Sequence, residues 1–236
     1  WTEVKRQATT AHSFGLDMQL LTPCEAQDLW PLMVVDDAVG AAFLPTDGQA
    51  NPSDIPLSLA KGARMAGALI YEDTKVTGIE VDKGVIKGIE TSQGYISCGV
   101  VIACCGQWTR DFARCVGVNV PLVSVEHQYM VTEPIAGVSP DMPTLRDPDR
   151  LTYYKEEVGG LVMGGYEPNP IMWAKKGLPK GFHYQLLESN FDHFEPIMEQ
   201  ALGRVPALQT AGVKMLTNGP ESLRPTVISS WAKRLS

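Results

Sequence analysis

The spacing of apolar residues near the start of the chain predicts two helices. Residues 1–17 follow a helical pattern. Thr22 and Pro23 are typical of an N-cap and a first helical residue, so a short second helix should begin there and end before Pro31.

A third helix is predicted farther along the chain. The segment Asn51-Pro52-Ser53-Asp54 is typical of a helix N-terminus. An apolar stripe through Ile55, Leu59 and Ala63 gives this helix one apolar face, and Gly67 should end it.

From residue 68 the apolar pattern changes to a period of two, which is typical of strands. Strands are expected at 68–72, 75–82, 84–92 and 95–105, with turns at Asp82-Lys83-Gly84 and Ser92-Gln93-Gly94. The last strand ends in GVVIACC, which is apolar on both faces and suits a strand buried in a parallel sheet. The helix-then-strand order before it suits an α/β unit.

A second block with a different pattern begins near Pro121. Before it, a turn at 106–108 should lead into a short helix closed by Gly117. Strands of a mostly antiparallel sheet are then expected at 121–134, 151–157 and 160–168, followed by a helical stretch over 183–205 interrupted at Pro196. The final segment, from residue 221, shows neither a helical nor a strand periodicity.

Composition and charge exclude several kinds of partner. The net charge of -7 is spread over both halves, which argues against nucleic acid and anionic membrane surfaces. Neither a membrane-spanning run nor a targeting sequence is recognisable. The five cysteines form no C-x-x-C pair and have no histidine at metal-ligand spacing, so we expect no metal and a reducing compartment. Cys104 and Cys105 should be small buried residues at a strand end.

Seven short motifs occur in an order that resembles one family. They are PLMVVDD, DGQANPSDI, CGQW, VPLVSVEHQYMVTE, LRDPDRLTYYKEE, GGYEPNPIMW and NGPES. Together they resemble the D-amino-acid-oxidase-like flavoproteins, in the branch that contains sarcosine dehydrogenase, dimethylglycine dehydrogenase and the pyruvate dehydrogenase phosphatase regulatory subunit.

The resemblance implies an FAD cofactor and an α/β (α+β) fold. Residues 1–120 should form an incomplete Rossmann-like FAD-binding domain. Residues 121–220 should form a mostly antiparallel substrate-binding sheet with flanking helices, and residues 221–236 a divergent tail.

Two features of the resembling family are missing from the sequence. The family holds the pyrophosphate of FAD at a G-x-G-x-x-G turn between a strand and a helix, and no such fingerprint occurs here. After Ser222, LRPTVISSWAKRLS stands where the family has a glycine-rich stretch. The chain also opens at Trp1 within a helical pattern. We therefore expect a fragment that binds FAD weakly or not at all and is poorly soluble.

The resemblance directs attention to two catalytic candidates. Oxidation of an N-methyl amine needs few charged groups, because a hydride passes to flavin N5. His127 lies on a predicted strand and could accept the ammonium proton or orient the amine; the alternative is a hydrogen-bonded core histidine. Alternation lets only one of Tyr153 and Tyr154 face the flavin. The resemblance implies that Tyr153 closes the substrate pocket, and the alternative is cross-strand aromatic packing.

Four residues are candidates for FAD binding on the same grounds. Gly106, Gln107 and Trp108 follow the apolar strand, where glycine permits close backbone approach to a cofactor. In the family this turn passes beside the flavin; an ordinary strand-to-helix turn is the alternative. Val76 matches the position where the family's backbone meets the adenine of FAD. The alternative is a plain buried valine on a strand.

Two further features have a functional and an ordinary interpretation. The turn Asp47-Gly48-Gln49 could border the flavin, although loops are generally rich in aspartate and glycine. Arg146 could pair with a substrate carboxylate, or it is a solvated loop arginine.

The resemblance leaves two functions open. The first is FAD-dependent oxidative N-demethylation of sarcosine or dimethylglycine as part of a larger enzyme, with electron-transfer flavoprotein and tetrahydrofolate as partners. The second is a non-catalytic regulatory protein that acts through a protein partner, or an inactive fragment. The HQY and YY motifs favour the enzyme. The protein should be cytoplasmic if bacterial and in the mitochondrial matrix if eukaryotic.

Overall fold

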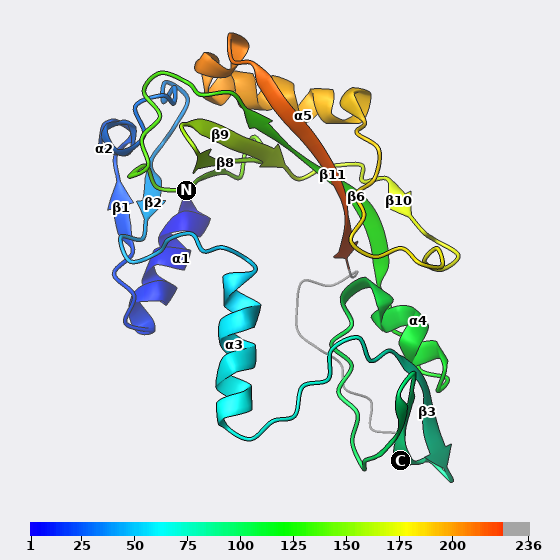
Figure 1. The fold of residues 1–236 in the computed structure, drawn as a ribbon. Helices are drawn as coiled ribbons and strands as arrows, with labels where there is room; N and C mark the ends of the chain where they lie inside the picture. Colours follow the sequence, from blue (N-terminus) through cyan, green and yellow to red (C-terminus); the bar gives the residue numbers. More distant parts are fainter. Residues whose placement is uncertain (224–236) are drawn as a thin grey trace. The chain divides into compact units, whose positions relative to one another are not determined.

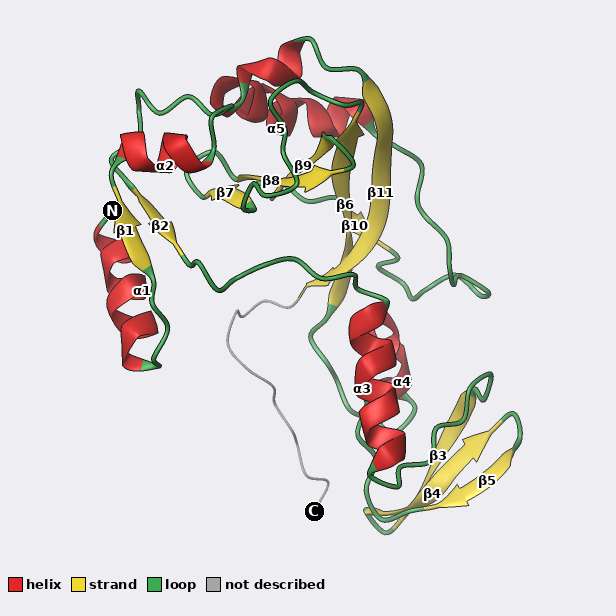
Figure 2. Cartoon of the chain, turned by 60° about the vertical axis from the view of Figure 1, so that its left-hand side comes forward, coloured by secondary structure: helices red, strands yellow, loops and turns green. Residues whose placement is uncertain are grey.

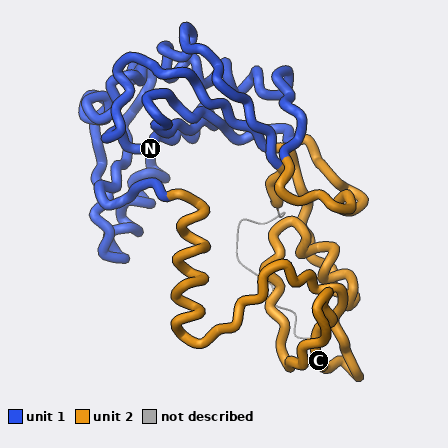
Figure 3. Tube along the Cα trace, viewed as in Figure 1, with its two compact units in different colours: residues 1–50, 127–170, 186–219 blue, residues 51–126, 171–185, 220–236 orange. Residues whose placement is uncertain are grey.

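A computed structural model describes residues 1–223, which form parts of two compact units (Figure 3). Unit 1 contains residues 1–50, 127–170 and 186–219. Unit 2 contains residues 51–126 and 171–185 and, of the described chain end, residues 220–223. Each unit is assembled from separate stretches of sequence, and the expected domain boundaries at 120 and 220 stay a prediction.

The largest sheet has six strands and confirms the expected antiparallel architecture. Its order is β10–β6–β9–β8–β7, with every neighbouring pair antiparallel, and β11 also pairs with β6. The strands are β6 (Val123–Thr132), β7 (Leu145–Asp147), β8 (Thr152–Glu157), β9 (Gly160–Gly165), β10 (Met172–Trp173) and β11 (Val213–Leu223). The short β7 and β10 and the long β11 were not predicted. The expected tail begins inside β11, and its residues after 223 lie outside the described part.

One face of this sheet in unit 1 is covered by helix α5 (Phe191–Arg204), as Figures 1 and 2 show. Met130, Met163 and Tyr154 lie opposite one another on β6, β9 and β8, and all three are buried. They share a hydrophobic core with Phe194, Ile197 and Ala201 of α5. Because side chains alternate along a strand, the residues between them lie on the other face.

Helix α5 is continuous, so the predicted interruption at Pro196 is wrong. Proline removes one main-chain hydrogen bond, and here it lies in the second turn, with buried Phe194 and Ile197 on either side of it in sequence. The helix begins after Asn190, whose side chain accepts a hydrogen bond from His193 N at 3.1 Å. Residues 183–190, which we expected to be helical, precede it.

The first part of unit 1 confirms the two predicted helices and adds a hairpin. Its elements are α1 (Thr2–Ser13), β1 (Gln19–Leu21), α2 (Pro23–Leu29) and β2 (Ala41–Phe43). Thr22 caps α2 through a reciprocal arrangement with Glu25, in which each side chain bonds the other's main-chain N–H. Strands β1 and β2 pair antiparallel.

A group of four charged residues, of which Asp147 and Arg204 are buried, joins three segments of unit 1. Arg204 Nε donates to Asp147 Oδ2 at 2.7 Å, and Arg204 Nη1 lies 2.8 Å from Asp37 Oδ1. Arg150 donates to the other oxygen of Asp37 at 2.8 Å. These contacts link the end of α5 to the end of β7 and to the loop before β2.

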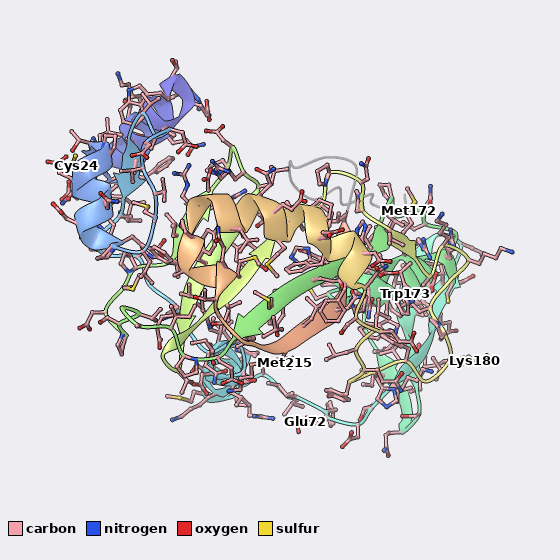
Figure 4. The ribbon with its side chains drawn as sticks, turned by 90° about the horizontal axis from the view of Figure 1, so that it is seen from above. Cys24, Glu72, Met172, Trp173, Lys180 and Met215 are labelled. Carbon is pink, nitrogen blue, oxygen red and sulfur yellow. The ribbon has the colours of Figure 1, made fainter. Side chains whose placement is uncertain are left out.

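Unit 2 contains a helix, a three-stranded antiparallel sheet and a short helical segment. Its elements in chain order are α3 (Asp54–Met65), β3 (Val76–Asp82), β4 (Val85–Thr91), β5 (Gly94–Ser97), η1 (Gly106–Trp108) and α4 (Thr109–Arg114), with the β10 strand later. The predicted turn between β3 and β4 is confirmed, with Lys83 and Gly84 both at positive φ. Figure 4 shows Trp173 of β10, whose ring lies 4.5 Å from that of Phe182, and Lys180 in the loop between them.

Several predictions for unit 2 are wrong. Residues 68–72 and 99–105 form no strand, and Val100 and Ile102 are 75% and 81% exposed. An interior strand needs neighbours to take up its N–H and C=O groups, and no described residue pairs with 99–105 as a ladder. Cys104 is therefore exposed instead of buried. The apolar stripe of α3 is also exposed, since that helix has no buried residue.

Candidate functional site

A row of four residues crosses unit 1 on the face opposite α5. Tyr129 of β6 pairs with Gly164 of β9, Gly164 with Tyr153 of β8, and Tyr153 with Arg146 of β7. His127 lies two residues before Tyr129 and therefore shares its face. Alternation thus brings the two predicted catalytic residues to one face of the sheet.

The structure separates the two adjacent tyrosines as the alternation predicts. Tyr154 is 1% exposed in the core, and its hydroxyl lies 3.1 Å from Thr152 Oγ1 and 3.4 Å from the Ala201 carbonyl oxygen. Burial raises the pKa of Tyr154 to about 12. Tyr153 is half-buried on the opposite face, with its ring over Gly164. Its role in closing a substrate pocket stays a prediction.

Tyr166, just after β9, is the centre of the cluster. Its ring centroid lies 5.9 Å from that of His127 and 6.1 Å from that of Tyr153. The Arg146 guanidinium carbon lies 5.0 Å from the same ring centroid, at the distance of a cation–π contact. Tyr166 thus gathers a histidine, a phenol and a cation from β6, β8 and β7.

Glu167 lies behind His127. The His127 Nδ1 and Glu167 Oε2 atoms are 3.1 Å apart, and the two side chains are 20% and 6% exposed. Glu167 Oε1 accepts a hydrogen bond from Gln128 N at 3.3 Å. Burial opposes ionisation of Glu167, but hydrogen bonds from His127 and from main-chain N–H groups outweigh it, so the pKa of this carboxyl is lowered.

The predicted cofactor-binding residues belong to unit 2, whereas the Tyr166 cluster belongs to unit 1. Gly106, Gln107 and Trp108 form η1, with Gly106 at φ 52° and Trp108 43% exposed. Gln107 Oε1 accepts from Ser124 Oγ at 3.4 Å. Val76 is the half-buried first residue of β3. Their contacts with FAD stay a prediction.

The remaining polar candidates give no sign of a metal site. Among residues 1–223, no three histidine, cysteine or acidic side chains are placed to hold a metal ion. Asp47 lies in an exposed turn after β2, where its carboxylate accepts from Gly48 N at 2.8 Å. Cys24 lies on the surface of α2 (Figure 4). No helix of the described part is long and apolar enough to cross a membrane.

Comparison with known families decides the assignment. The model of a family described as "DAO: FAD dependent oxidoreductase" matches residues 1–230. The chain belongs to the DAO family. FAD is accordingly the cofactor of its family, as the sequence motifs predicted.

Three curated relatives of this DAO-family chain illustrate its range. Human mitochondrial sarcosine dehydrogenase is 38% identical over 228 residues, which cover 94% of this chain and 24% of the relative. The mouse mitochondrial pyruvate dehydrogenase phosphatase regulatory subunit is 33% identical over 94% of this chain and 26% of its own length. Human mitochondrial dimethylglycine dehydrogenase is 30% identical, with 96% and 27% covered. The chain thus spans about a quarter of the length of these relatives.

Solved structures agree on the fold. L-proline dehydrogenase from P. horikoshii superposes with a TM-score of 0.79 at 24% identity, over 98% of this chain and 60% of that one. Glycine oxidase from Geobacillus kaustophilus gives 0.68 at 22% identity, over 95% and 56%. The α/β (α+β) fold class is therefore confirmed.

The residues present fit one part of FAD and not another. Aromatic and cationic side chains on the open sheet face suit a flat ring and a small polar substrate. The pyrophosphate needs a glycine-rich turn at a helix N-terminus, and this sequence contains no G-x-G-x-x-G. The Tyr166 cluster is therefore the candidate site among the described residues.

Two members of this cluster were missed in the sequence. Tyr166 and Glu167 belong to the quoted GGYEPNPIMW motif but received no role. The signal was available, because an aromatic residue two positions after Gly164 must share the face of Tyr153. The pairing of Glu167 with His127 spans 40 residues and has no local signal.

Proposed function

We propose that this chain supplies the substrate-facing sheet of an FAD-dependent enzyme that oxidatively demethylates sarcosine or dimethylglycine. The observation that carries the proposal is the meeting of His127, Tyr153 and Arg146 around Tyr166. A proton acceptor, a hydroxyl and a cation are the groups that an N-methylated amino acid requires. The sarcosine and dimethylglycine dehydrogenases among the relatives support the substrate class.

His127 is suited to the proton transfer that must accompany oxidation. These substrates carry an ammonium group in water, and their nitrogen must lose its proton before the adjacent methyl carbon can give up a hydride. A carboxylate only accepts hydrogen bonds, so an ionised Glu167 requires the proton of neutral His127 to lie on Nδ1. Nε2 then carries the lone pair that accepts the ammonium proton. FAD, when bound, takes up the hydride.

Arg146 is suited to the substrate carboxylate. A guanidinium can bind a carboxylate through two parallel N–H groups. The Arg146 guanidinium and the His127 ring lie 5.0 and 5.9 Å from the Tyr166 ring centroid. A small zwitterion above Tyr166 would therefore place its carboxylate towards Arg146 and its amine towards His127, with the Tyr153 hydroxyl as a further donor.

The partners of the complete enzyme follow from this chemistry. We propose that electron-transfer flavoprotein removes the electrons and that tetrahydrofolate takes up the one-carbon unit. We also propose the mitochondrial matrix as its location in a eukaryote, because the named relatives are mitochondrial, and the cytoplasm in a bacterium. The residues that would border FAD are Val76, Gly106, Gln107 and Trp108.

Anaerobic reduction of the bound flavin by sarcosine and by dimethylglycine tests the function. His127→Asn should slow flavin reduction by about 10²- to 10⁴-fold, the usual contribution of a general base. Glu157→Gln, a matched change at a partly exposed position at the end of β8, should leave the rate unchanged. A flavin-loaded protein that neither amine reduces would sink the proposal. If such a protein instead binds the pyruvate dehydrogenase phosphatase, a regulatory function replaces it.

A further inference from the structure

Glu167 holds the His127 ring in place relative to its own strand. One carboxylate oxygen contacts His127 Nδ1 at 3.1 Å, and the other accepts from Gln128 N at 3.3 Å. The carboxylate therefore binds a ring and the next main-chain N–H of the same strand, which restricts rotation of the ring.

The strand at this point is also fixed from the opposite face. Gln128 is fully buried, and its amide donates to the Asn190 carbonyl oxygen at 3.1 Å and accepts from Asn190 N at 2.8 Å. Asn190 is the N-cap of α5. Glu167 thus acts on a backbone that the core already holds rigid.

We propose that Glu167 is a positioning residue, which keeps the proton of neutral His127 on Nδ1 and stabilises the imidazolium once Nε2 has accepted the substrate proton. The proposal rests on the proposed function, since it assigns His127 the role of base. In the step itself an N–H bond of the ammonium breaks and an Nε2–H bond forms. The Glu167 carboxylate stays ionised, and no electron moves in this step.

The other groups near His127 make the carboxylate necessary. Tyr166 packs against the ring and Tyr153 packs against Tyr166. Arg146 brings a positive charge to the same aromatic ring and so disfavours a second cation. Glu167 places a buried carboxylate 3.1 Å from His127 Nδ1, and its negative charge offsets that repulsion.

Histidine-ring ¹⁵N NMR of the whole chain tests the proposal without FAD or turnover. The chain has four histidines, and His127→Asn identifies the His127 signals by their loss. The neutral ring should carry its proton on Nδ1, and Glu167→Gln should make His127 titrate at lower pH. Glu157→Gln should change neither property. A neutral ring protonated on Nε2, or a titration that Glu167→Gln leaves unmoved, overturns the proposal.

A second variant separates positioning from folding. Glu167→Asp keeps the negative charge on a shorter side chain, so its His127 should titrate above that of Glu167→Gln. Equal titration in the two variants would contradict a charge effect. If Glu167→Gln fails to fold, Glu167→Asp is compared with wild type instead. Its His127 should titrate at lower pH than His127 of wild type, and an identical titration would be contrary to the proposal.

Turnover provides an independent readout. The acid limb of the kcat/KM profile should move to lower pH in Glu167→Gln, because the base is then weaker, and the plateau should fall by roughly 10- to 100-fold. A purely structural role would lower the plateau without moving the limb. If neither amine is oxidised, the proposed function fails while the NMR result still decides the role of Glu167.

Discussion

The ring of Tyr153 lies directly over Gly164, its partner on the neighbouring strand. A Cβ atom built at Gly164 would overlap the Tyr153 ring, with Tyr153 Cε2 only 3.0 Å away. The glycine therefore lets a large ring lie across β9 towards Tyr166. This arrangement explains how three strands bring their side chains to one cluster.

Gly164→Ala should displace the Tyr153 ring. The overlap should destabilise the protein by about 1–3 kcal/mol, the usual range for overpacking, and should change the Tyr153 resonances. Gly48→Ala is the matched control, because a Cβ there meets nothing within 4 Å. In urea unfolding, combining Gly164→Ala with Tyr153→Ala should remove most of the cost. An additive double variant would show that the ring does not lie over the glycine.

Tyr154→Phe should destabilise the core by about 1 kcal/mol at neutral pH, because the Tyr154 hydroxyl bonds to Thr152 and to the Ala201 carbonyl. Tyr184→Phe, at a fully exposed position, should cost much less. Chemical denaturation of the two variants measures the difference. Equal losses would mean that the hydrogen bonds of the Tyr154 hydroxyl contribute no stability.

The same residue gives a pH dependence with a definite sign. Burial raises the pKa of Tyr154 from 10.0 to about 12. The folded state therefore favours the neutral phenol, and this stabilisation is present below pH 10 and lost as the pH rises towards 12. Between pH 10 and about pH 12, the free energy of unfolding of wild type should fall by roughly 2–3 kcal/mol relative to that of Tyr154→Phe. A constant difference between the two proteins would refute the shift.

Arg204→Met should be among the most damaging single changes. It removes the closer of the two guanidinium groups that pair with buried Asp147 and leaves only Arg150, at 3.8 Å; loss of a buried ion-pair partner typically costs about 3–5 kcal/mol. Arg204→Lys should rescue little, because one ammonium cannot replace the separate Nε and Nη1 contacts. Arg6→Met, which breaks an exposed pair with Glu3, is the control and should cost less than about 1 kcal/mol.

The same charges predict the response to acid. Hydrogen bonds from Arg150 and Arg204 lower the pKa of Asp37. A lowered folded-state pKa stabilises the protein above the ordinary carboxyl range, and that stabilisation is lost as the pH falls through the folded pKa. Asp37→Asn should therefore unfold less steeply with acid than wild type. Equally steep acid unfolding of wild type and Asp37→Asn would contradict this prediction.

The antiparallel sheet was predictable because its pattern is local. Tyr153 and Tyr154 are adjacent, and alternation alone assigns one to the core and the other to the open face. Alternation alone could not predict a catalytic role for His127, since a histidine on a strand can have several roles. Only the family resemblance singled it out. Its contact with Glu167 joins the middle of β6 to the segment just after β9, 40 residues away, which no local pattern encodes.

The wrong predictions concern segments whose structure does not follow from a local pattern. Residues 99–105 have the composition of an interior strand, but a strand forms only where neighbours accept its hydrogen bonds, and the described chain offers none there. Strands β1 and β2 have three residues each, too few to show a period. Pro196 was interpreted as a break, although the core contacts of α5 outweigh a single lost hydrogen bond.

Arg146→Met tests whether the cation on Tyr166 binds the substrate carboxylate. A charged hydrogen bond contributes about 1.5–3 kcal/mol, so KM for sarcosine should rise by roughly 10- to 100-fold with a smaller change in kcat. Arg146→Lys should retain part of the affinity, since it keeps the charge but not the two-pronged geometry. Dimethylamine has an N-methyl group and no carboxylate, so any turnover of it should be insensitive to Arg146. A similar loss for both amines would assign Arg146 to the support of Tyr166 instead of to the substrate.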